Sequence, residues 1–270
     1  MRKKKTELLV VVSDLHCGSH VALAPPETET HTGNVVGFGK NIHQEWLWEN
    51  WLEMVKKVGS ICNGDRAALV VNGDATEGAH HRNNAELVAS EIEVHATMAK
   101  ECLTPLLDIC HKSYVVKGTE CHTRDMESYL AKLIEAEGCS AKDKWLLDFS
   151  GCLVDAAHHM GTSSRSYLEA SLLSITMGNA NLNYVRAGHR VPSVYLRAHR
   201  HCHGVYSDGK SMIAVTGAWQ WLTRHGHKVV QTSIPRPSAV VMDWRGRPSG
   251  ALPHCHEIIF NTPQHEITHV

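Results

Sequence analysis

Five apolar segments of the chain each end in acidic or histidine residues, and this pattern constrains the fold more than any other feature. Branched aliphatic residues favour buried β-strands, and in a mostly parallel sheet the carboxyl ends of the strands meet along one edge. We therefore expect the polar side chains at these ends to converge. In chain order, the segments and their terminal residues are VVVSDLH with Asp14 and His16, AALVVNGD with Asp74, KSYVVKGTECH with Glu120 and His122, CLVDAAHH with His158 and His159, and SVYLRAHRHCH with His199, His201 and His203.

Stretches with helical periodicity lie between and around these segments. Pro105 is expected to kink or divide one of the helices, and Gly138 to stop another. His95 falls on an apolar helical stripe with no ligand types near it in sequence, which favours a satisfied buried histidine over a metal ligand. The predicted helices span residues 42–62, 83–111, 124–138 and 164–185.

Short strand-like runs follow the last of the five segments, at residues 211–219, 228–234, 238–244 and 256–260. Alternation of strands and helices predicts an α/β fold. Neither a linker nor a repeat interrupts the pattern, so we expect one domain over residues 1–270, a length sufficient for a sizeable core.

Composition excludes several classes of protein. The chain is 43% apolar and 20% charged, as in globular proteins. Nine scattered cysteines without a CxxC pair favour reduced thiols and a cytoplasmic location. The N-terminal apolar run is too short for a signal peptide, and no run is long enough to span a membrane. Residues 186–270 hold ten Lys or Arg against four Asp or Glu, so this third either attracts an anion or forms an ordinary solvated surface.

The mixture of carboxylates and imidazoles at the strand ends is typical of manganese, iron or zinc sites, because calcium and magnesium prefer oxygen ligands. Seven or more ligands exceed what one ion needs. They suit two ions about 4 Å apart that share a carboxylate, an arrangement that generates hydroxide near neutral pH and binds the oxygens of a phosphate ester.

The order of these motifs resembles that of the calcineurin-like metallophosphoesterases, in particular single-domain members of the phage and prophage type. The matching segments are SDLHCG, NGDATEG, KGTECH, DAAHHMG and RAHRHCHG, which together cover about three quarters of the chain. The resemblance implies a four-layer sandwich of two β-sheets flanked by helices, with a binuclear metal centre at one edge.

The resemblance also implies roles for individual residues. Asp14, His16 and His201 would bind the first ion, Asp74 would bridge the two ions, His158 and His199 would bind the second, and His122 would contact the phosphate or protonate the leaving oxygen. His159 is the alternative to His158 as a ligand, and is otherwise expected beside the substrate.

The chain departs from the family pattern in three places. Where the family has Asn-His after the glycine of its third motif, this chain has Thr119 and Glu120, and we assign the ligand role of the missing asparagine to Glu120. Ala198 replaces the glycine of the last motif. Residues 19–40 are expected to form an inserted loop, which is either a lid or substrate wall, or surface padding.

Other side chains near the motifs have both a functional and a structural interpretation. Arg200 lies between two expected ligands, where it can bind a phosphate. Glu77 either orients a ligand from behind or forms a surface salt bridge. Trp219 and Trp221 either stack on a nucleobase or pack in the core, and core packing is favoured for at least one of them. His203 has no role in the family.

The sequence thus predicts a phosphoesterase that uses two divalent transition-metal ions, with manganese favoured over iron or zinc. The expected substrate is a phosphate ester, with a nucleotide or nucleic acid as one option, and no membrane partner is expected. The alternative is a metal-binding or nucleic-acid-binding module on the same fold that has lost catalysis, which the altered third motif favours. Two other metallohydrolase classes fit poorly. A metallo-β-lactamase-like site would need HxHxDH, which the chain lacks, and an amidohydrolase would need HxH on the first strand, where the chain has Asp14-x-His16.

Overall fold

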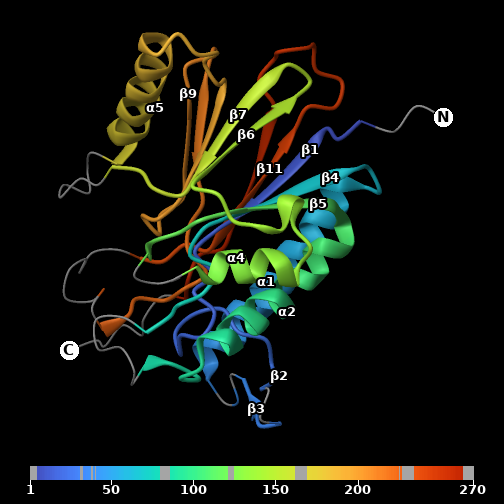
Figure 1. The fold of residues 1–270 in the computed structure, drawn as a ribbon, viewed down its shortest axis with the longest axis vertical. Helices are drawn as coiled ribbons and strands as arrows, with labels where there is room; N and C mark the ends of the chain where they lie inside the picture. Colours follow the sequence, from blue (N-terminus) through green and yellow to red (C-terminus); the bar gives the residue numbers. More distant parts are fainter. Residues whose placement is uncertain are drawn as a thin grey trace, which may run out of the picture.

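The computed structural model describes residues 5–30, 33–37, 39, 41–79, 86–120, 125–161, 169–224, 226 and 234–263. Within these residues two five-stranded β-sheets are present, and a short hairpin of β2 (Thr28–Glu29) and β3 (Val35–Val36) lies inside the predicted inserted loop. Together with their flanking helices the sheets give the expected α/β four-layer architecture (Figure 1).

The first sheet has the strand order β12-β11-β1-β4-β5. Strands β1, β4 and β5 run parallel to one another, while β11 is antiparallel to β1 and to β12. Its strands are β1 (Leu8–Val12), β4 (Ala67–Asn72), β5 (Cys110–Val116), β11 (Ser238–Asp243) and β12 (His254–Ile259).

The second sheet has the order β6-β7-β8-β10-β9. Its three central strands β7, β8 and β10 are parallel, and the edge strands β6 and β9 are antiparallel to their neighbours. The strands are β6 (Lys144–Phe149), β7 (Cys152–Ala157), β8 (Val194–Arg197), β9 (Gly204–Ser207) and β10 (Met212–Val215).

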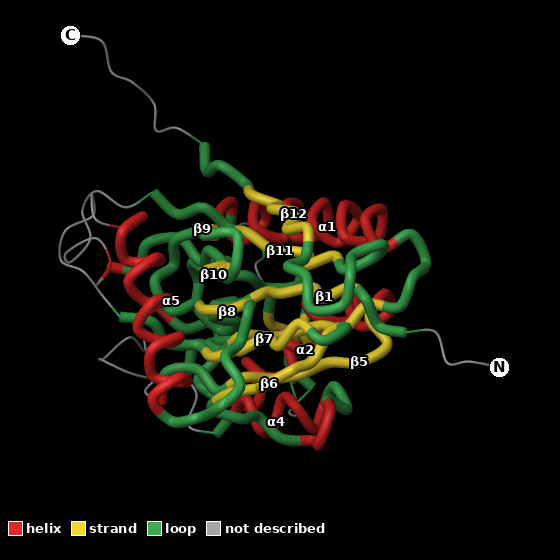
Figure 2. The backbone as a smooth tube through the Cα atoms, turned by 90° about the horizontal axis from the view of Figure 1, so that it is seen from above, coloured by secondary structure: helices red, strands yellow, loops and turns green. Residues whose placement is uncertain are grey.

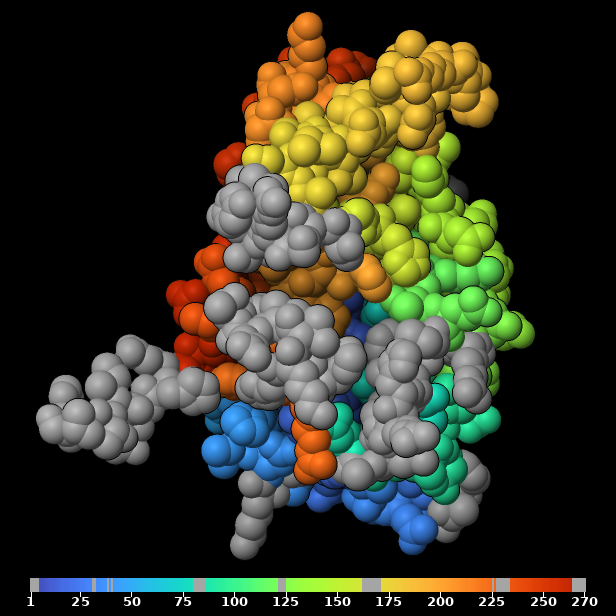
Figure 3. Space-filling model, turned by 90° about the vertical axis from the view of Figure 1, so that its left-hand side faces the viewer, coloured from blue at the N-terminus to red at the C-terminus, as the bar shows by residue number. Residues whose placement is uncertain are grey.

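Helices cover the outer faces of both sheets. Helices α1 (Ile42–Cys62), α2 (Ile92–Ile109) and α4 (Met126–Leu133) lie against the first sheet, and α5 (Glu169–Arg186) lies beside the second. Seen from above, α5 stands apart from the other helices, next to β8, β9 and β10 (Figure 2). The space-filling view shows the same separation, with α5 at the top and residues of the N-terminal third at the bottom (Figure 3).

The alternation of side chains along each central strand explains these layers. In β1, Leu8, Val10 and Val12 face the helices, whereas Leu9 and Val11 face the second sheet. Because successive side chains point to opposite faces, a strand buried on both sides needs an unbroken apolar run, and LLVVV supplies one. A third, smaller cluster joins the second sheet to α5.

Helix α1 has the predicted bounds. The Asn41 side chain accepts hydrogen bonds from the backbone N–H groups of His43 and Gln44, and Asn63 ends the helix in the left-handed conformation. The prediction for residues 83–111 extended too far toward the N-terminus, because α2 starts at Ile92. Residues before it pair instead with the segment after β1, through Val88 N–H to Gly18 O at 2.8 Å.

The effect of Pro105 and the end of α4 also differ from prediction. Pro105 lies within α2 without ending it. Helix α4 ends at Leu133 rather than continuing to Gly138, which has a φ of 74° within a 3-10 turn, η2 (Glu137–Cys139). Residues 164–168 of the helix predicted over 164–185 lie outside the described residues, and α5 is described from Glu169 to Arg186.

Strand β6 was missed in the sequence. It is the edge strand of the second sheet and alternates between buried and exposed side chains, with Leu146 half exposed. Polar Lys144 and Asp148 flank only three consecutive apolar residues, so the apolar run of β6 is shorter than that of β1. The strand predicted at 228–234 lies outside the described residues except for Ile234, which is in no strand.

Candidate metal centre

The segments that follow β1 and β4 run side by side beyond the ends of their strands. The backbone N–H of Asp14 donates to Gly73 O, and that of His16 donates to Asp74 O, each at 3.0 Å. Because β1 and β4 are parallel neighbours, the residues after their carboxyl ends emerge together. Asp14 and Asp74 therefore lie at the same place on the sheet edge, as predicted.

The second sheet brings histidines to the same place. The segments after β7 and β8 are joined by a hydrogen bond from Ala198 N–H to His158 O at 2.8 Å. The backbone N–H of His199 then donates to Asp14 Oδ2 at 3.3 Å. This bond crosses from one sheet to the other, so the four strand ends form one cluster of side chains.

Within that cluster, three overlapping groups have ligand atoms close enough to hold a metal ion. The atoms of each group lie within 4.8 Å of one another. The groups are Asp14, His16 and His201; Asp14, Asp74 and His158; and His158, His159 and His199.

In the first group, two imidazole nitrogens face each other. His16 Nε2 lies 3.1 Å from His201 Nε2, and Asp14 Oδ1 lies 3.6 Å from the His201 nitrogen. On its other side, His16 Nδ1 lies 2.8 Å from Glu77 Oε2. Glu77 is buried and also accepts a hydrogen bond from Gln220 Nε2. Glu77 is therefore a buried residue that orients His16 from behind.

In the second group, His158 is held by two contacts. Its Nδ1 lies 2.7 Å from Asn72 O, and its Nε2 lies 3.0 Å from Asp74 Oδ2. His158 also packs with His159 and His199. Each pair of these three rings meets edge to face, with centroids 4.8–5.3 Å apart. His158 is buried, whereas His159 is exposed. A backbone carbonyl behind an imidazole fixes its tautomer and ring orientation, as in many metal sites.

The backbone at these side chains is strained. The left-handed conformation is uncommon for residues other than glycine, and such outliers gather at functional sites. Five residues of the cluster adopt it, with φ between 47° and 73°. They are Asp14, His16, Asp74, His199 and His201.

Two glycines are required by close contacts around the cluster. A Cβ at Gly118 would lie 2.1 Å from Asp74 Oδ1, and a Cβ at Gly73 would lie 2.4 Å from His158 Nδ1. Gly73 also has a φ of 85°. The glycines of the second and third sequence motifs thus allow the backbone to approach the side chains that form the cluster.

Burial and nearby charges perturb the pKa values of the cluster. Burial lowers the pKa of His16, but the hydrogen bond and the charge of Glu77 outweigh it and raise the pKa to about 9. Burial likewise lowers the pKa of His158, and Asp74 and Asp14 raise it to about 9. For Asp14, burial raises the carboxyl pKa above its usual range. These groups bind protons tightly at positions where a cation would relieve the same excess of negative charge.

The donor set fits divalent transition-metal ions. Asp14 Oδ1 is buried, and no hydrogen-bond partner for it exists among the residues that the structure describes. It lies 4.0 Å from His16 Nε2 and 4.0 Å from His158 Nε2. A buried carboxylate oxygen aimed between imidazole nitrogens has the geometry of a metal ligand, and this mixture of oxygen and nitrogen donors suits manganese, iron or zinc.

The third motif behaves differently from expectation. Glu120 is exposed and belongs to none of the three groups, so the structure does not place it as a ligand. Thr119 lies there instead: its Oγ1 is 3.0 Å from Asp74 Oδ2 and 3.1 Å from His199 Nδ1. The sequence signal for Thr119 was its position directly after Gly118. His122, the expected catalytic residue, lies outside the described residues.

The two arginines of the last motif make different contacts. Arg200, between His199 and His201 in the sequence, donates to Gly161 O at 3.3 Å. Arg197 instead pairs with buried Asp155 at 2.9 Å, and its role is structural.

The two tryptophans also differ. Trp219 is fully buried and packs edge to face on Trp51, whereas Trp221 is half-buried against Trp46 and His43. At least one tryptophan therefore belongs to the core, as favoured from the sequence.

His95 is a satisfied buried histidine, as predicted. Its Nδ1 accepts from Gly78 N–H at 3.3 Å, and its Nε2 lies 2.9 Å from Ala89 O. His203 is bound away from the cluster, with Nε2 2.7 Å from Glu257 Oε2 and Nδ1 3.0 Å from Ser238 Oγ.

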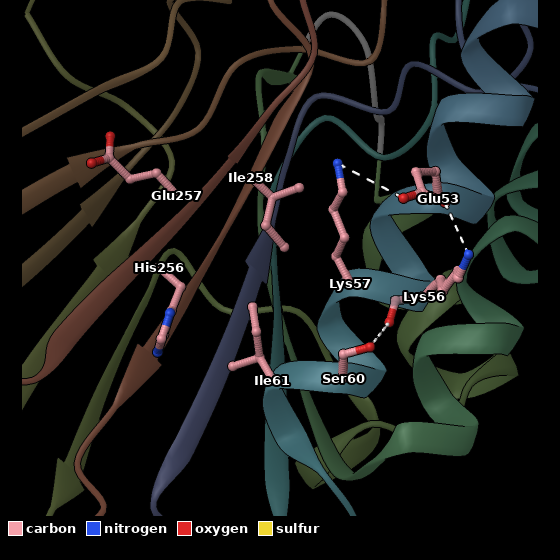
Figure 4. A pocket seen from close by; sticks show the side chains of 8 residues that line it. All are labelled: Glu53, Lys56, Lys57, Ser60, Ile61, His256, Glu257 and Ile258. Carbon is pink, nitrogen blue, oxygen red and sulfur yellow. Dashed lines mark hydrogen bonds and ion pairs between the residues drawn. The ribbon is translucent and has the colours of Figure 1, made fainter.

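The wide depression between α1 and the edge strand β12 is separate from the cluster (Figure 4). Glu53 of α1 forms surface ion pairs with Lys56 and Lys57 there, and His256 and Ile258 form the opposite wall. None of the residues that line it belongs to the three ligand groups. Exposed ion pairs of this kind contribute little to stability, and the depression gives no indication of chemistry.

Comparison with known proteins by sequence finds no relative. No protein-family model matches the chain, and no curated protein does. Among solved structures, a phosphodiesterase from an archaeon is 11% identical, with 94% of this chain and 99% of that chain covered and a TM-score of 0.44. Wild-type Vps29 complexed with zinc, from Entamoeba histolytica, is 10% identical, covers 94% and 99%, and has a TM-score of 0.41.

A third similar structure is the sulfate thiohydrolase SoxB of Thermus thermophilus, 12% identical, with 97% of this chain and 57% of that chain covered and a TM-score of 0.43. Similarity at this level says nothing about activity, so the proposals below rest on the residues of this chain. No helix in the described part of the chain has the length and apolar character needed to cross a membrane.

Proposed function

We propose that the chain is a metal-dependent phosphoric ester hydrolase that works with two divalent transition-metal ions. One observation supports this above all others: side chains from the ends of four strands, two in each sheet, meet around the buried Asp14 Oδ1. A folded chain rarely gathers buried carboxylates and imidazoles in this number without a ligand, because burying charged groups is costly unless they are paired.

The three ligand groups support a division into two neighbouring positions. Asp14, His16 and His201 would hold the first ion, and His158 and His199 the second. Asp74 would lie between them, since its carboxylate is 3.0 Å from His158 Nε2 and follows the strand next to that of Asp14. Manganese is the proposed metal, with iron or zinc as alternatives, since all three accept this donor set.

Divalent cations held there would supply a Lewis acid and a hydroxide nucleophile near neutral pH. The chain's own residues would position the ester. Arg200 and the exposed His159 lie on the segments that carry the ligands, where a guanidinium and an imidazole can donate to phosphoryl oxygens. His122 is the proposed proton donor to the leaving oxygen. The basic C-terminal third favours an anionic substrate such as a nucleotide or nucleic acid.

The test combines metal content with turnover. Protein stripped with a chelator and reloaded with manganese should contain close to two ions and hydrolyse p-nitrophenyl phosphate or bis(p-nitrophenyl) phosphate. Asp74→Asn should lower both metal content and turnover. Asp143→Asn is the matched control, because the Asp143 side chain is 88% exposed and pairs only with surface Lys117. Bound metal with no turnover of either ester would contradict hydrolase activity.

A second function, a metal-binding or nucleic-acid-binding module without catalysis, is favoured by Thr119. A neutral hydroxyl stands there beside Asp74 and His199, where the resemblance implies an asparagine amide. His122→Ala separates the two functions: a loss of turnover with metal content unchanged supports the hydrolase. Turnover that is already absent in the unsubstituted protein, with metal bound, supports the module.

A further inference from the structure

A pocket of about 340 Å³ lies between α5 and the second sheet. Apolar side chains form most of its wall: Met160, Leu172, Leu173, Val205 and Val215. Met160 and Val215 are buried, and the other three are half-buried. No carboxylate is among the described residues that line it.

None of the described residues that line the pocket belongs to the three ligand groups, but two of them are neighbours in sequence of candidate ligands. Met160 directly follows His159, and Arg200, which also lines the pocket, stands between His199 and His201. The hydrogen bond from Arg200 Nη1 to Gly161 O joins the two segments that carry these residues. The lining of the pocket therefore continues from the segments that carry His159, His199 and His201.

We propose that this pocket binds the ring-bearing organic group of the substrate, the substituent carried by the phosphate oxygen. The inference rests on the proposed hydrolase function, because it takes the phosphoryl group to lie at the metal centre. Small-molecule pockets are mostly apolar with a few polar groups that fix orientation, and they span roughly 300–1,000 Å³. A volume of about 340 Å³ is at the lower end of that range.

The size and lining of the pocket define the substrate class. One ring system, such as an aryl group or a nucleoside, fits this volume, whereas several stacked nucleotides do not. Apolar walls favour a planar ring over a sugar chain or a charged peptide, because removing apolar surface from water is favourable in proportion to area. Met160 adds a polarisable sulfur that makes favourable contacts with aromatic rings. The substrate is thus a small phosphate ester of an aryl or nucleoside alcohol.

Binding of phosphonates to the manganese-loaded protein tests this without turnover, because their carbon–phosphorus bond is not hydrolysed. Isothermal titration calorimetry should show phenylphosphonate binding at least tenfold more tightly than methylphosphonate. A nucleoside 5′-phosphonate measured beside them tells whether the preferred ring is a base or a simple aryl group. Equal affinities for the methyl compound and both ring-bearing compounds would overturn the proposal.

Two variants on α5 locate the effect. Leu172→Trp should fill the pocket and reduce the phenyl-to-methyl ratio to threefold or less. Ile175→Trp is the matched control, since Ile175 is on the same helix, is 55% exposed and lies outside the pocket lining; the ratio should stay at least tenfold. Equal ratios in the two variants would contradict the assignment, and circular dichroism with metal analysis confirms that both variants fold.

The outcomes for the pocket and for the hydrolase are separable. Ring preference in phosphonate binding without hydrolysis of any ester would retain the pocket and remove the enzymatic function. Hydrolysis with no preference between ring-bearing and methyl phosphonates would retain the enzyme and remove the pocket.

Discussion

Replacing Glu77 with glutamine tests the metal centre through a residue that is not itself a ligand. Glu77 is buried, lies 2.8 Å from His16 Nδ1 and accepts from Gln220 Nε2 at 3.1 Å. Glutamine keeps the size of the side chain and an acceptor oxygen but removes the negative charge. If His16 binds a metal ion through Nε2, the substitution weakens that bond by making the imidazole a poorer donor that is held less firmly.

The magnitude follows from two opposing effects. Loss of a carboxylate behind a ligating histidine typically costs about 10–100-fold in metal affinity, or about 1.4–2.7 kcal/mol. Against this, Glu77 raises the pKa of His16, so its removal lowers that pKa from about 9 and reduces competition from protons. Competition between protons and metal ions for His16 is strong at pH 7 and absent well above pH 9. We therefore expect a loss of at least about tenfold at high pH and a smaller loss at pH 7.

The assay is a competition titration of manganese or zinc against a fluorescent chelator, carried out at pH 7 and at pH 9.5. Glu53→Gln is the matched control, because the Glu53 side chain is 44% exposed and forms only surface ion pairs on α1. The control should bind metal as the unsubstituted protein does. A Glu77→Gln variant that folds and binds metal within twofold of the unsubstituted protein at both pH values would refute the assignment of His16 as a ligand.

Three further predictions address the remainder of the centre. Gly118→Ala should lower the thermal midpoint by an amount equivalent to about 1–3 kcal/mol and reduce bound metal, because the new Cβ would lie 2.1 Å from Asp74 Oδ1; unchanged melting and metal content would contradict the close approach. Thr119→Asn should tighten binding of the second ion several-fold and Thr119→Ala should weaken it, as measured by metal titration, since Thr119 Oγ1 lies beside Asp74; equal affinities in both variants would argue against a ligand position. In the metal-free protein, protonated His16 and His158 contribute stability that is fully present below their ordinary pKa of 6.5 and lost as pH rises through about 9. Thermal melts with a chelator should show this loss while metal affinity rises over the same pH range, and flat profiles for both would refute it.

The arrangement of the fold could be predicted because its strands carry a simple physical signal. A strand buried on both faces is mostly apolar, so β1 (LLVVV) and the first five residues of β4 (AALVV) are recognisable as central strands without any knowledge of their partners. Strand β6, with one face exposed, has a mixed pattern and was missed. The start of α2 was also misplaced, since pairing of Val88 with Gly18 is a tertiary contact that periodicity does not encode.

The site was predictable to a similar extent and for a similar reason. Residues directly after central parallel strands share one edge by topology alone, and Asp14, Asp74 and His158 could be placed together from their position in sequence. Glu120 could not be placed in this way, because the third segment ends before it: β5 stops at Val116. Beyond a strand end, the direction of a side chain depends on turn geometry, and here the turn directs Thr119 toward the cluster.

Backbone strain links the fold to the proposed chemistry. Five residues of the cluster adopt left-handed conformations, each of which costs on the order of 1 kcal/mol for a residue with a Cβ. Together these give about 5 kcal/mol, comparable with the whole stability of a small domain. Such a cost persists only where surrounding structure enforces it, and the two sheets do so through the bonds from Asp14 to Gly73 and from His199 to Asp14. The same turns aim the carboxylate and imidazole groups at one point, so a bound cation would recover in ligand bonds part of what the backbone gives up, and binding of metal should be strongly coupled to folding of this edge of the sandwich.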